Sequence, residues 1–296
     1  MKILITGATG QVGWELARSL MPLGDIVAPA RQDCDLSRPE ALPQIIRDIR
    51  PDIIVNAAAY TAVDRAEAEE ALATTVNGTA VGILANEARR LGALLLHYST
   101  DYVFDGAKPA PYVENDSVCP LSAYGRSKLK GEQATRDAGC DHLILRTTWV
   151  YAARGQNFVK TILRLARERP NLRIVDDQHG APTWARNIAD ATAHILRQVE
   201  AERRAHTFVS GTFHLTASGA TTWYGFARAI LEQARAIHPS VELLAREISP
   251  IPSEAYPLPA KRPKNSRLDG AALKARFGIA LPQWDAALRM CLEETL

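Results

Sequence analysis

The stretch Lys2-Ile-Leu-Ile-Thr6 runs directly into Gly7-Ala-Thr-Gly10-Gln-Val-Gly13, and together these residues decide the fold of the 296-residue chain. The short apolar run is typical of a buried parallel strand, and a helical pattern follows the glycines from Trp14 to Met21. A strand, a glycine-rich turn and a helix in this order form the first unit of a dinucleotide-binding fold. A plain tight turn is the alternative, because the spacing is G-x-x-G-x-x-G rather than G-x-G-x-x-G.

In the functional interpretation each glycine of this turn has a separate task. Gly7 lets the chain turn tightly, Gly10 lets the backbone approach a pyrophosphate, and Gly13 lets the helix pack on the strand. The free N–H groups and the dipole of the helix favour an anion at this point. Gln11 and Val12, between the last two glycines, belong to the same predicted cofactor site.

Two more apolar strands continue the pattern. They run from Ile26 to Ala30 and from Asp52 to Asn56, with a helix from Pro39 to Arg50 between them. Apolar strands that alternate with helices predict an α/β fold with a doubly wound parallel sheet of the Rossmann type. Ligands bind such sheets at the carboxyl ends of the strands. The small residues after the third strand would therefore let a cofactor lie close to the backbone: Ala57, Ala58, Ala59 and Thr61.

The end of the second strand bears on the choice of cofactor. It carries Arg31 in place of the acidic residue that would bind a free ribose 2′-hydroxyl, and a guanidinium suits a 2′-phosphate. We therefore expect NADPH, with NADH kept as a second cofactor, although an exposed arginine without a role is common after a strand. Asp35, followed by Leu36, would place a carboxylate against the adenine amino group.

Polar residues follow the next predicted strand. A long helix from Glu67 to Leu91 leads into a buried strand from Ala93 to Tyr98, which ends in Ser99-Thr100-Asp101. These side chains would face the same crevice as the nucleotide. Thr100 can orient a substrate carbonyl, and Asp101 can accept a hydrogen bond from a sugar hydroxyl. The plainer interpretation is that both residues cap the following turn.

The stretch Ser122-Ala-Tyr124-Gly-Arg-Ser-Lys128 carries a candidate catalytic pair. Tyr124 and Lys128 are four residues apart and would lie one turn apart on the same face of a helix, which we expect Pro120 to open. A phenol loses its proton near pH 10, which makes it a poor acid–base catalyst at neutral pH. An ammonium one turn away favours the phenolate and is expected to lower that pKa toward neutrality. Such pairs also occur on solvated helix faces, so the interpretation depends on the neighbouring motifs.

Composition excludes several classes of function. The 35 basic and 33 acidic residues nearly balance, so the charge does not predict binding to nucleic acid or to an anionic membrane. No apolar run approaches the roughly 18 residues of a membrane span, and we expect no secretory signal. The cysteines have no metal-ligand spacing and are typical of reduced thiols in a cytoplasmic protein: Cys34, Cys119, Cys140 and Cys291.

Four motifs occur in the order seen in extended short-chain dehydrogenases that act on nucleotide sugars: Thr6-Gly-Ala-Thr-Gly-Gln-Val-Gly13, Asn56-Ala-Ala-Ala59, Ser99-Thr-Asp-Tyr-Val-Phe104 and Tyr124-Gly-Arg-Ser-Lys128. More narrowly, the chain resembles the family of dTDP-4-dehydrorhamnose reductases. The segments that support this are His97-Tyr-Ser-Thr-Asp-Tyr-Val-Phe104, Arg146-Thr-Thr-Trp-Val-Tyr151, Asp177-Gln-His-Gly-Ala-Pro-Thr183, Thr222-Trp223, Pro257 to Leu268 and Leu281-Pro-Gln-Trp284. The likeness runs from Met1 almost to Leu296.

The resemblance implies a reaction and a division of labour. The 4-keto group of dTDP-4-dehydro-L-rhamnose would be reduced with NADPH to give dTDP-L-rhamnose, in the last step toward that sugar donor. Tyr124 would donate the proton, Lys128 would hold the nicotinamide ribose and keep Tyr124 acidic, and Thr100 would polarise the carbonyl. Tyr98 would also contact the cofactor.

On the substrate side the resemblance singles out three residues beside Thr100 and Asp101. Trp149 would pack against the sugar, and Trp223 would offer a stacking surface, although both are also plausible core residues. Arg262 lies in the proline-rich basic segment from Ser249 to Arg267 and would make a forked contact with the dTDP diphosphate. The alternative for that segment is a solvated basic loop.

The resemblance also implies two interleaved domains. Residues 1–150 would bind NADPH, and residues 151–296 would mainly form a smaller α/β domain for the dTDP-sugar. A helix capped by Thr183 and running to about Glu202 would pack back on the first domain. A second helix, capped by Thr222, would run to Ile237.

One position departs from the family pattern. Some members dimerise through Mg²⁺ held by glutamates, including one on the first helix and one after the Ala-Pro-Thr loop. Glu15 is present here, but the second position holds Arg186, a cation in place of a ligand. We therefore expect no metal, and a homodimer is left open.

Two other functions are weighed against the reductase. A nucleotide-sugar epimerase or 4,6-dehydratase would use the same fold, but dehydratases of this type have a glutamate two residues after the threonine, where this chain has Tyr102. A non-catalytic regulatory subunit could keep the fold to bind a partner. The intact Tyr124, Lys128 and Thr100 argue against that, because a binding module has no need of them.

Overall fold

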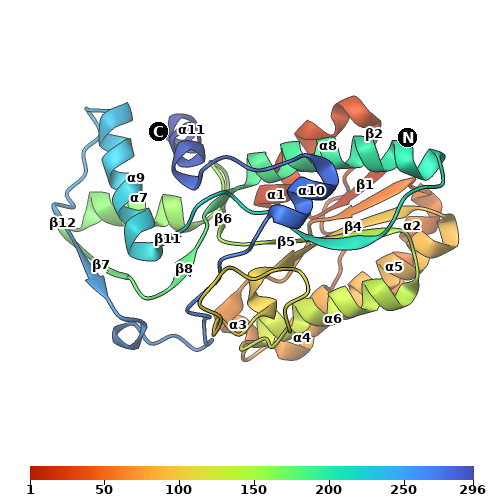
Figure 1. Cartoon of the computed structure of the whole chain (residues 1–296), viewed down its shortest axis with the longest axis horizontal. Coiled ribbons are helices and arrows are strands. Elements are labelled where there is room, and N and C mark those ends of the chain that lie inside the picture. Colours follow the sequence, from red (N-terminus) through yellow and green to blue (C-terminus); the bar gives the residue numbers. More distant parts are fainter.

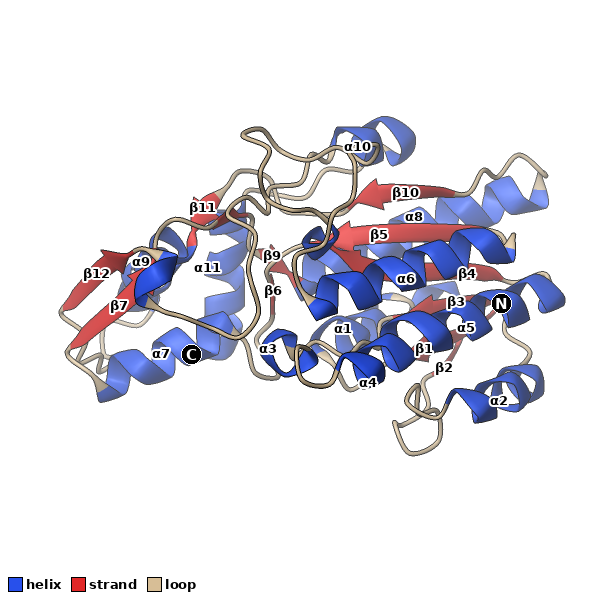
Figure 2. Cartoon of the chain, turned by 90° about the horizontal axis from the view of Figure 1, so that it is seen from below, coloured by secondary structure: helices blue, strands red, loops and turns tan.

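A six-stranded parallel sheet forms the centre of the larger lobe, in a computed structural model that describes all 296 residues (Figure 1). The strand order is β10-β5-β4-β3-β1-β2, the doubly wound arrangement that the sequence predicts. The strands are β1 (Lys2–Thr6), β2 (Asp25–Val27), β3 (Ile53–Asn56), β4 (Leu94–Thr100), β5 (His142–Thr147) and β10 (Gly211–His214). Figure 2 shows that they point toward the smaller lobe, so their carboxyl ends face the junction of the two lobes.

Helices cover both faces of this sheet (Figure 1). On one face lie α1 (Gln11–Ser19) and α8 (Ala185–Arg204), and on the other lie α2 (Leu42–Ile49), α5 (Ala80–Leu91) and α6 (Ala123–Ala138). Neighbouring residues of a strand alternate between these layers, so Ile3 packs in the core with α1 and α8, and Leu4 packs in the core with α2 and α5. Burial on both faces explains the apolar runs of the inner strands β1 and β3.

The second half of the chain completes the larger lobe. The edge strand β10 pairs in parallel with β5, and Ile188 and Ile195 of α8 lie in the same core as Ile3. Leu273 and Phe277 of α10 (Ala271–Phe277) join that core. The sheet is therefore built from residues of both halves.

The smaller lobe has its own core of helices around a strand pair. Its helices are α7 (Phe158–Glu168), α9 (Trp223–Ile237) and α11 (Trp284–Thr295), and its parallel pair is β7 (Asn171–Val175) with β12 (Glu247–Ile251). The predicted cap at Thr222 is confirmed, since its hydroxyl accepts a hydrogen bond from the Gly225 amide. Short pairs join the lobes: β6 (Val150–Tyr151) with β9 (Thr183–Trp184), and β8 (His179–Gly180) with β11 (Thr221–Thr222).

The expected helix from Glu67 to Leu91 is present from Glu70 to Leu91, but it is not a regular α-helix throughout. It consists of α4 (Glu70–Thr74), a π-helical segment, Thr75–Thr79, and α5, and the short helix α3 (Val63–Ala66) precedes it. In the π-helical segment the Asn77 side chain accepts from the Tyr60 amide and donates to the Tyr60 carbonyl, so it holds the loop after β3. A π-helical turn is a common way to insert such a contact into a helix.

Two predicted helix starts are wrong. Helix α6 begins at Ala123 and not at Pro120, because the Ser122 hydroxyl accepts from the Gly125 amide and caps it. Thr183 lies in β9, where its hydroxyl donates to the Ala181 carbonyl, and α8 begins after Trp184 without a side-chain cap. None of the helices combines the length and apolar character needed to cross a bilayer.

Candidate active site

The carboxyl ends of β1, β3, β4 and β5 open into a cleft of about 790 Å³. The predicted cofactor residues line it, with the exception of Gly13: Gly7, Gly10, Gln11, Val12, Arg31, Asp35, Leu36, Ala57, Ala58, Ala59, Thr61, Tyr98, Tyr124 and Lys128. The predicted substrate residues line it as well, with the exception of Arg262: Thr100, Asp101, Trp149 and Trp223. The cleft therefore brings together residues from six separate motifs of the sequence.

The glycine-rich turn leaves an open floor at one end of the cleft. Gly7 has a φ of 72°, and a Cβ there would lie 2.6 Å from the Ala58 amide nitrogen. Helix α1 starts at Gln11, and the N-cap residue Gly10 has no side chain to bind its first amides, which stay free for an anion. Gly13 serves the packing of helix on strand, because a Cβ there would lie 2.1 Å from the Gly7 carbonyl oxygen.

A loop from the second half of the chain covers this floor, and its place over the cleft is absent from the sequence predictions. Gly155, Gln156 and Asn157 line the cleft, and the Asn157 amide donates to the Gln11 side-chain oxygen over 2.8 Å. Asn157 also caps α7, since its oxygen accepts from the Lys160 amide. An N-cap signal before α7 is visible in the sequence, but the contact with Gln11 depends on the fold.

Tyr124 lies at the start of α6, beside the end of β4. Burial raises the pKa of Tyr124 well above its usual range, and the adjacent Thr100 hydroxyl lowers it only in part. The expected lowering of this pKa by Lys128 is wrong for this structure. The physical reason is that the Lys128 ammonium is engaged elsewhere, while desolvation disfavours the phenolate.

Lys128 is buried, and its ammonium is held by one backbone acceptor and one side-chain acceptor. Its Nζ donates to the Tyr98 carbonyl oxygen at 2.6 Å and lies 3.3 Å from Nε2 of His97. Burial lowers the pKa of Lys128 to about 8, and the charge of Glu132 offsets part of this. Since Lys128 also lines the cleft, its remaining N–H is available there.

Thr100 and Asp101 form a connected pair at the end of β4. The Thr100 hydroxyl donates to Oδ1 of Asp101 at 3.0 Å and accepts from the Tyr102 amide at 3.2 Å. A hydroxyl has one proton, so Thr100 can donate toward Tyr124 or a substrate only when that proton turns away from Asp101. Asp101 is 3% exposed, its Oδ2 has no hydrogen-bond partner, and burial raises its pKa to about 6.

Two tryptophans close the side of the cleft that faces the smaller lobe. The indole rings of Trp149 and Trp223 stack with centroids 3.6 Å apart and planes 9° from parallel. Gly180 makes room for the pair, because a Cβ there would lie 2.5 Å from the Trp149 ring. The indole nitrogen of Trp223 donates to the Gln178 side chain. Each tryptophan is thus both a packing partner of the other and a wall of the cleft.

Comparison with known proteins now decides the family. The model of the RmlD substrate binding domain family matches residues 1–296 of the chain. The chain belongs to the RmlD substrate binding domain family. A dTDP-4-dehydrorhamnose reductase of Burkholderia thailandensis is 57% identical over 296 residues, which cover 100% of this chain and 99% of that protein.

Solved structures of similar proteins have the same fold as this RmlD family member. A dTDP-4-dehydrorhamnose reductase of Clostridium acetobutylicum has a TM-score of 0.89 and 35% identity, and the match covers 99% of each chain. A dTDP-4-dehydrorhamnose reductase of Bacillus anthracis, crystallised in complex with NADP, has a TM-score of 0.87 and 34% identity, again over 99% of each chain. The predicted fold class and family are confirmed.

In this RmlD family member, Arg31 lies at the far end of the cleft from Tyr124. Its side chain is 79% exposed, and its Nε lies 3.6 Å from Oδ1 of Asp35. That Asp35 oxygen also accepts from the amide and the hydroxyl of Ser37, which lowers the pKa of Asp35. An exposed, weakly held guanidinium can turn toward a phosphate without breaking a buried contact.

Arg262 occupies a different place from the one that the sequence suggests. Its guanidinium makes a forked contact with Asp64 of α3, Nη1 to Oδ1 at 3.0 Å and Nη2 to Oδ2 at 2.8 Å, and it does not line the cleft. Its side chain is 19% exposed. The fork thus joins the proline-rich segment to the larger lobe, and a diphosphate would have to displace Asp64 to reach it. The phosphate contact stays a prediction.

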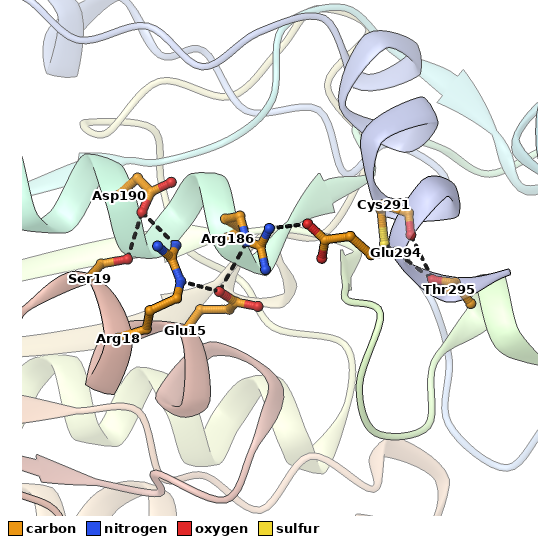
Figure 3. A network of polar contacts seen from close by, with 8 residues as sticks. All are labelled: Glu15, Arg18, Ser19, Arg186, Asp190, Cys291, Glu294 and Thr295. Carbon is orange, nitrogen blue, oxygen red and sulfur yellow. Dashed lines mark hydrogen bonds and ion pairs between the residues drawn. The ribbon is translucent and has the colours of Figure 1, made fainter.

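Arg186, at the position where the resemblance implies a metal-ligating glutamate, belongs to a network of ion pairs (Figure 3). Nε of Arg186 on α8 lies 3.2 Å from Oε2 of Glu15 on α1, and its Nη1 pairs with Glu294 on α11. Arg18 also pairs with Glu15, at 3.1 Å. Glu15 has its acceptor capacity directed at guanidinium groups, so this donor set does not fit a divalent cation.

Proposed function

We propose that the protein is an NADPH-dependent reductase that converts dTDP-4-dehydro-L-rhamnose to dTDP-L-rhamnose. The observation that carries the proposal is the meeting of Tyr124, Lys128 and Thr100 with the glycine-rich turn in one cleft. The full-length match to a protein named dTDP-4-dehydrorhamnose reductase supports the substrate. The NADP complex of the Bacillus anthracis relative supports the cofactor.

The residues of the cleft fit a dinucleotide. Gly7 and Gly10 leave the backbone bare beside the free amides at the start of α1, where a pyrophosphate would be stabilised. Arg31, exposed at the edge of the cleft, would bind the 2′-phosphate that distinguishes NADPH from NADH. When bound, NADPH supplies the hydride, and the protein supplies position and electrostatics.

The chain's own residues would handle the proton. Tyr124 is protonated at neutral pH because burial raises its pKa, and it would give its proton to the 4-keto oxygen. Lys128 would present its free N–H to the nicotinamide ribose. For Thr100 to polarise the carbonyl, its proton would have to leave Asp101 and turn to the substrate oxygen. Closure of the cleft by the two tryptophans would exclude water from this transfer.

The alternatives within the fold receive less support. A dehydratase would need an acid near position 102, and Tyr102 there packs edge-on against Tyr124, with a pKa that burial raises above the usual range. A regulatory subunit would have no use for the buried Lys128 ammonium, because burying a charge costs free energy and a binding role does not require one there. Net reduction therefore remains the function that the site supports best.

We also propose where and in what form the enzyme works. Residues 1–150, with α8 packed on them, would bind the cofactor, and residues 151–296 would mainly hold the sugar nucleotide. The four cysteines are free thiols, which suits the reducing cytoplasm. Homodimerisation, if it occurs, would not use a metal held by Glu15.

The direct test follows NADPH absorbance with freshly generated dTDP-4-dehydro-L-rhamnose, and NADH is run in parallel. We expect rapid oxidation of NADPH by the wild type, and a loss of at least about 100-fold in Tyr124→Phe, the usual size of a general-acid contribution. The variant should still bind NADPH. If the wild type binds NADPH but oxidises none of it, the substrate is wrong, and unchanged turnover in Tyr124→Phe would contradict the assigned acid.

A further inference from the structure

A buried histidine lies behind the catalytic lysine, and the proposed chemistry does not use it. His97 is on β4, is 0% exposed and does not line the cleft. Its Nε2 lies 3.3 Å from the Lys128 Nζ, and its Nδ1 lies 2.9 Å from the Asn56 amide on β3. Asn56 in turn is 2.5 Å from the Thr6 hydroxyl on β1. A polar chain thus crosses three neighbouring strands and ends on Lys128.

The close approach of α6 to this chain is built into the helix. Gly131 faces His97, and a Cβ there would lie 3.4 Å from Nε2 of His97 and 2.1 Å from the Asn77 carbonyl oxygen. A larger residue would push α6, and with it Lys128, away from the sheet. The close packing of α6 at Gly131 therefore keeps Lys128 next to His97.

The hydrogen-bond partners of His97 determine the protonation state and the tautomer of its imidazole. Burial and the Lys128 charge lower the pKa of His97 well below its usual range, so the ring is neutral and has one acceptor nitrogen. Beside an ammonium that acceptor has to be Nε2, so Nδ1 carries the proton and donates to the Asn56 side-chain oxygen. The Asn56 NH₂ then donates to the Thr6 hydroxyl, because the two ends of an amide are interchangeable in shape. In this pattern each nitrogen of the His97 ring has one hydrogen-bond partner.

We propose that His97 is the positioning residue of Lys128: its neutral imidazole accepts one N–H of the ammonium and, with the Tyr98 carbonyl, directs the remaining N–H into the cleft. Two fixed acceptors leave a tetrahedral ammonium only one free direction. The same acceptor stabilises the charged form of a lysine that burial would otherwise neutralise. The inference rests on the proposed role of Lys128 toward the nicotinamide ribose.

Few other titratable groups lie near Lys128. On its own helix these are Tyr124 and Glu132, and the Glu132 carboxylate pairs with Arg146 of β5 at 2.7 Å. On β4 they are His97 and Tyr98, whose phenol is bonded to Thr192 of α8. Glu132 supports the ammonium, but its carboxylate is already paired with an arginine. Of the two hydrogen-bond partners of the Lys128 Nζ, His97 is the one that is a side chain.

The test measures NADPH affinity from pH 6 to 10 in the full-length protein, by energy transfer from tryptophan to bound NADPH. We expect the NADPH affinity to fall at alkaline pH as Lys128 loses its proton. The fall that is absent in Lys128→Met defines the midpoint that belongs to the lysine. We expect His97→Leu and the shorter His97→Asn to move that midpoint down by about one unit or more, which is a tenfold change in the ionisation constant. His97→Gln should restore it, because its amide oxygen can reach the ammonium.

His214→Leu is the matched control. His214 is also 0% exposed and lies in the same sheet, on β10, but neither of its ring nitrogens has a hydrogen-bond partner. This variant should leave the pH midpoint unchanged. A midpoint in His97→Leu and His97→Asn equal to that of the wild type, or a shift of the same size in His214→Leu, would overturn the proposal.

The proposal would also be overturned if the NADPH affinity of the wild type did not fall at alkaline pH. If His97→Leu does not fold, as a thermal melt would reveal, His97→Asn and His97→Gln carry the comparison. The measurement requires no sugar nucleotide, so a wild type without turnover would count against the proposed substrate and leave this result standing.

Discussion

At the scale of single residues, the site is governed by burial more than by the charges within it. Burial raises the pKa of both Tyr124 and Asp101, and it lowers the pKa of Lys128 and His97. Each of these groups is thereby pushed toward its neutral form. The active site is thus prepared to donate the Tyr124 proton, and it retains one ammonium only where acceptors surround it.

Asp101 gives a stability prediction with a defined pH window. Its pKa rises from 3.8 to about 6 in the folded protein, so between these values the folded state holds a proton that the unfolded state has released. The contribution of Asp101 to stability therefore falls as the pH rises through about 4 to 6, and above pH 6 it amounts to a destabilisation of up to about 3 kcal/mol.

Asp101→Asn removes this penalty and keeps an oxygen for the Thr100 hydroxyl. We expect the variant and the wild type to melt at similar temperatures near pH 4, and the variant to become more stable than the wild type at pH 7. If the difference in melting temperature between the variant and the wild type were the same at every pH, ionisation of Asp101 would not destabilise the folded protein. The gain in stability should come with a loss of turnover, because Asp101 orients Thr100.

The limits of sequence reasoning are also visible in single residues. The glycine-rich turn and the Tyr124–Lys128 pair could be predicted, because both depend on local geometry: a tight turn in one case and one helical turn in the other. The partner of Arg262 could not, since Asp64 lies far away in the sequence and meets it only after folding. The direction of the Tyr124 pKa shift failed for the same reason, because burial is a property of the whole fold.

At the scale of elements, the apolar strands and their order could be predicted from the sequence, but the interruptions of the helices could not. Strands β1, β3, β4 and β5 have continuous apolar runs that only burial on both faces explains. The π-helical segment Thr75–Thr79 exists because Asn77 binds the Tyr60 backbone, and no periodicity announces such a contact. The same holds for the loop over the glycine-rich turn.

That loop supports a prediction about cofactor binding. Asn157 both caps α7 and donates to Gln11 at the floor of the cleft. Asn157→Ala should lower the stability by about 1 kcal/mol through loss of the cap. It should also weaken NADPH binding by about threefold to tenfold, because one hydrogen bond that holds the floor is lost.

Thr222→Ala is the matched control for Asn157→Ala. Thr222 caps α9 through the Gly225 amide, and its hydroxyl donates to Asp176, so its removal should cost at least as much stability. It lies in the smaller lobe and has no contact with Gln11, so NADPH affinity, measured by titration of fluorescence, should not change. Equal affinities in the two variants would show that the loop has no part in holding the cofactor.

At the scale of the whole molecule, ion pairs hold the two lobes together on both sides of the cleft. Arg262 joins the proline-rich segment to Asp64 of the larger lobe. On the other side, Arg186 of α8 lies between Glu15 of α1 and Glu294 of α11 (Figure 3). The Glu15 side chain is only 4% exposed, so loss of a guanidinium partner would leave a buried carboxylate with fewer hydrogen bonds.

This arrangement makes a clear prediction about metal. The Arg186 guanidinium occupies the position of a cation beside Glu15, so dialysis of the wild type against EDTA should change neither its melting temperature, its oligomeric state nor its turnover. Arg186→Gln leaves Glu15 with Arg18 alone, and it should lower the stability by about 1 to 3 kcal/mol, with or without Mg²⁺.

Arg186→Glu makes the comparison decisive. It would place a third carboxylate beside Glu15 and Glu294, and carboxylate oxygens are the ligands that Mg²⁺ and Ca²⁺ prefer. Without divalent cations, like-charge repulsion should make it less stable than Arg186→Gln, and addition of Mg²⁺ or Ca²⁺ should raise its melting temperature. A wild type that loses stability, dimer or activity in EDTA would show that a metal binds despite Arg186. A variant that no cation rescues would mean that these carboxylates cannot converge, so that Arg186 separates them rather than replacing an ion.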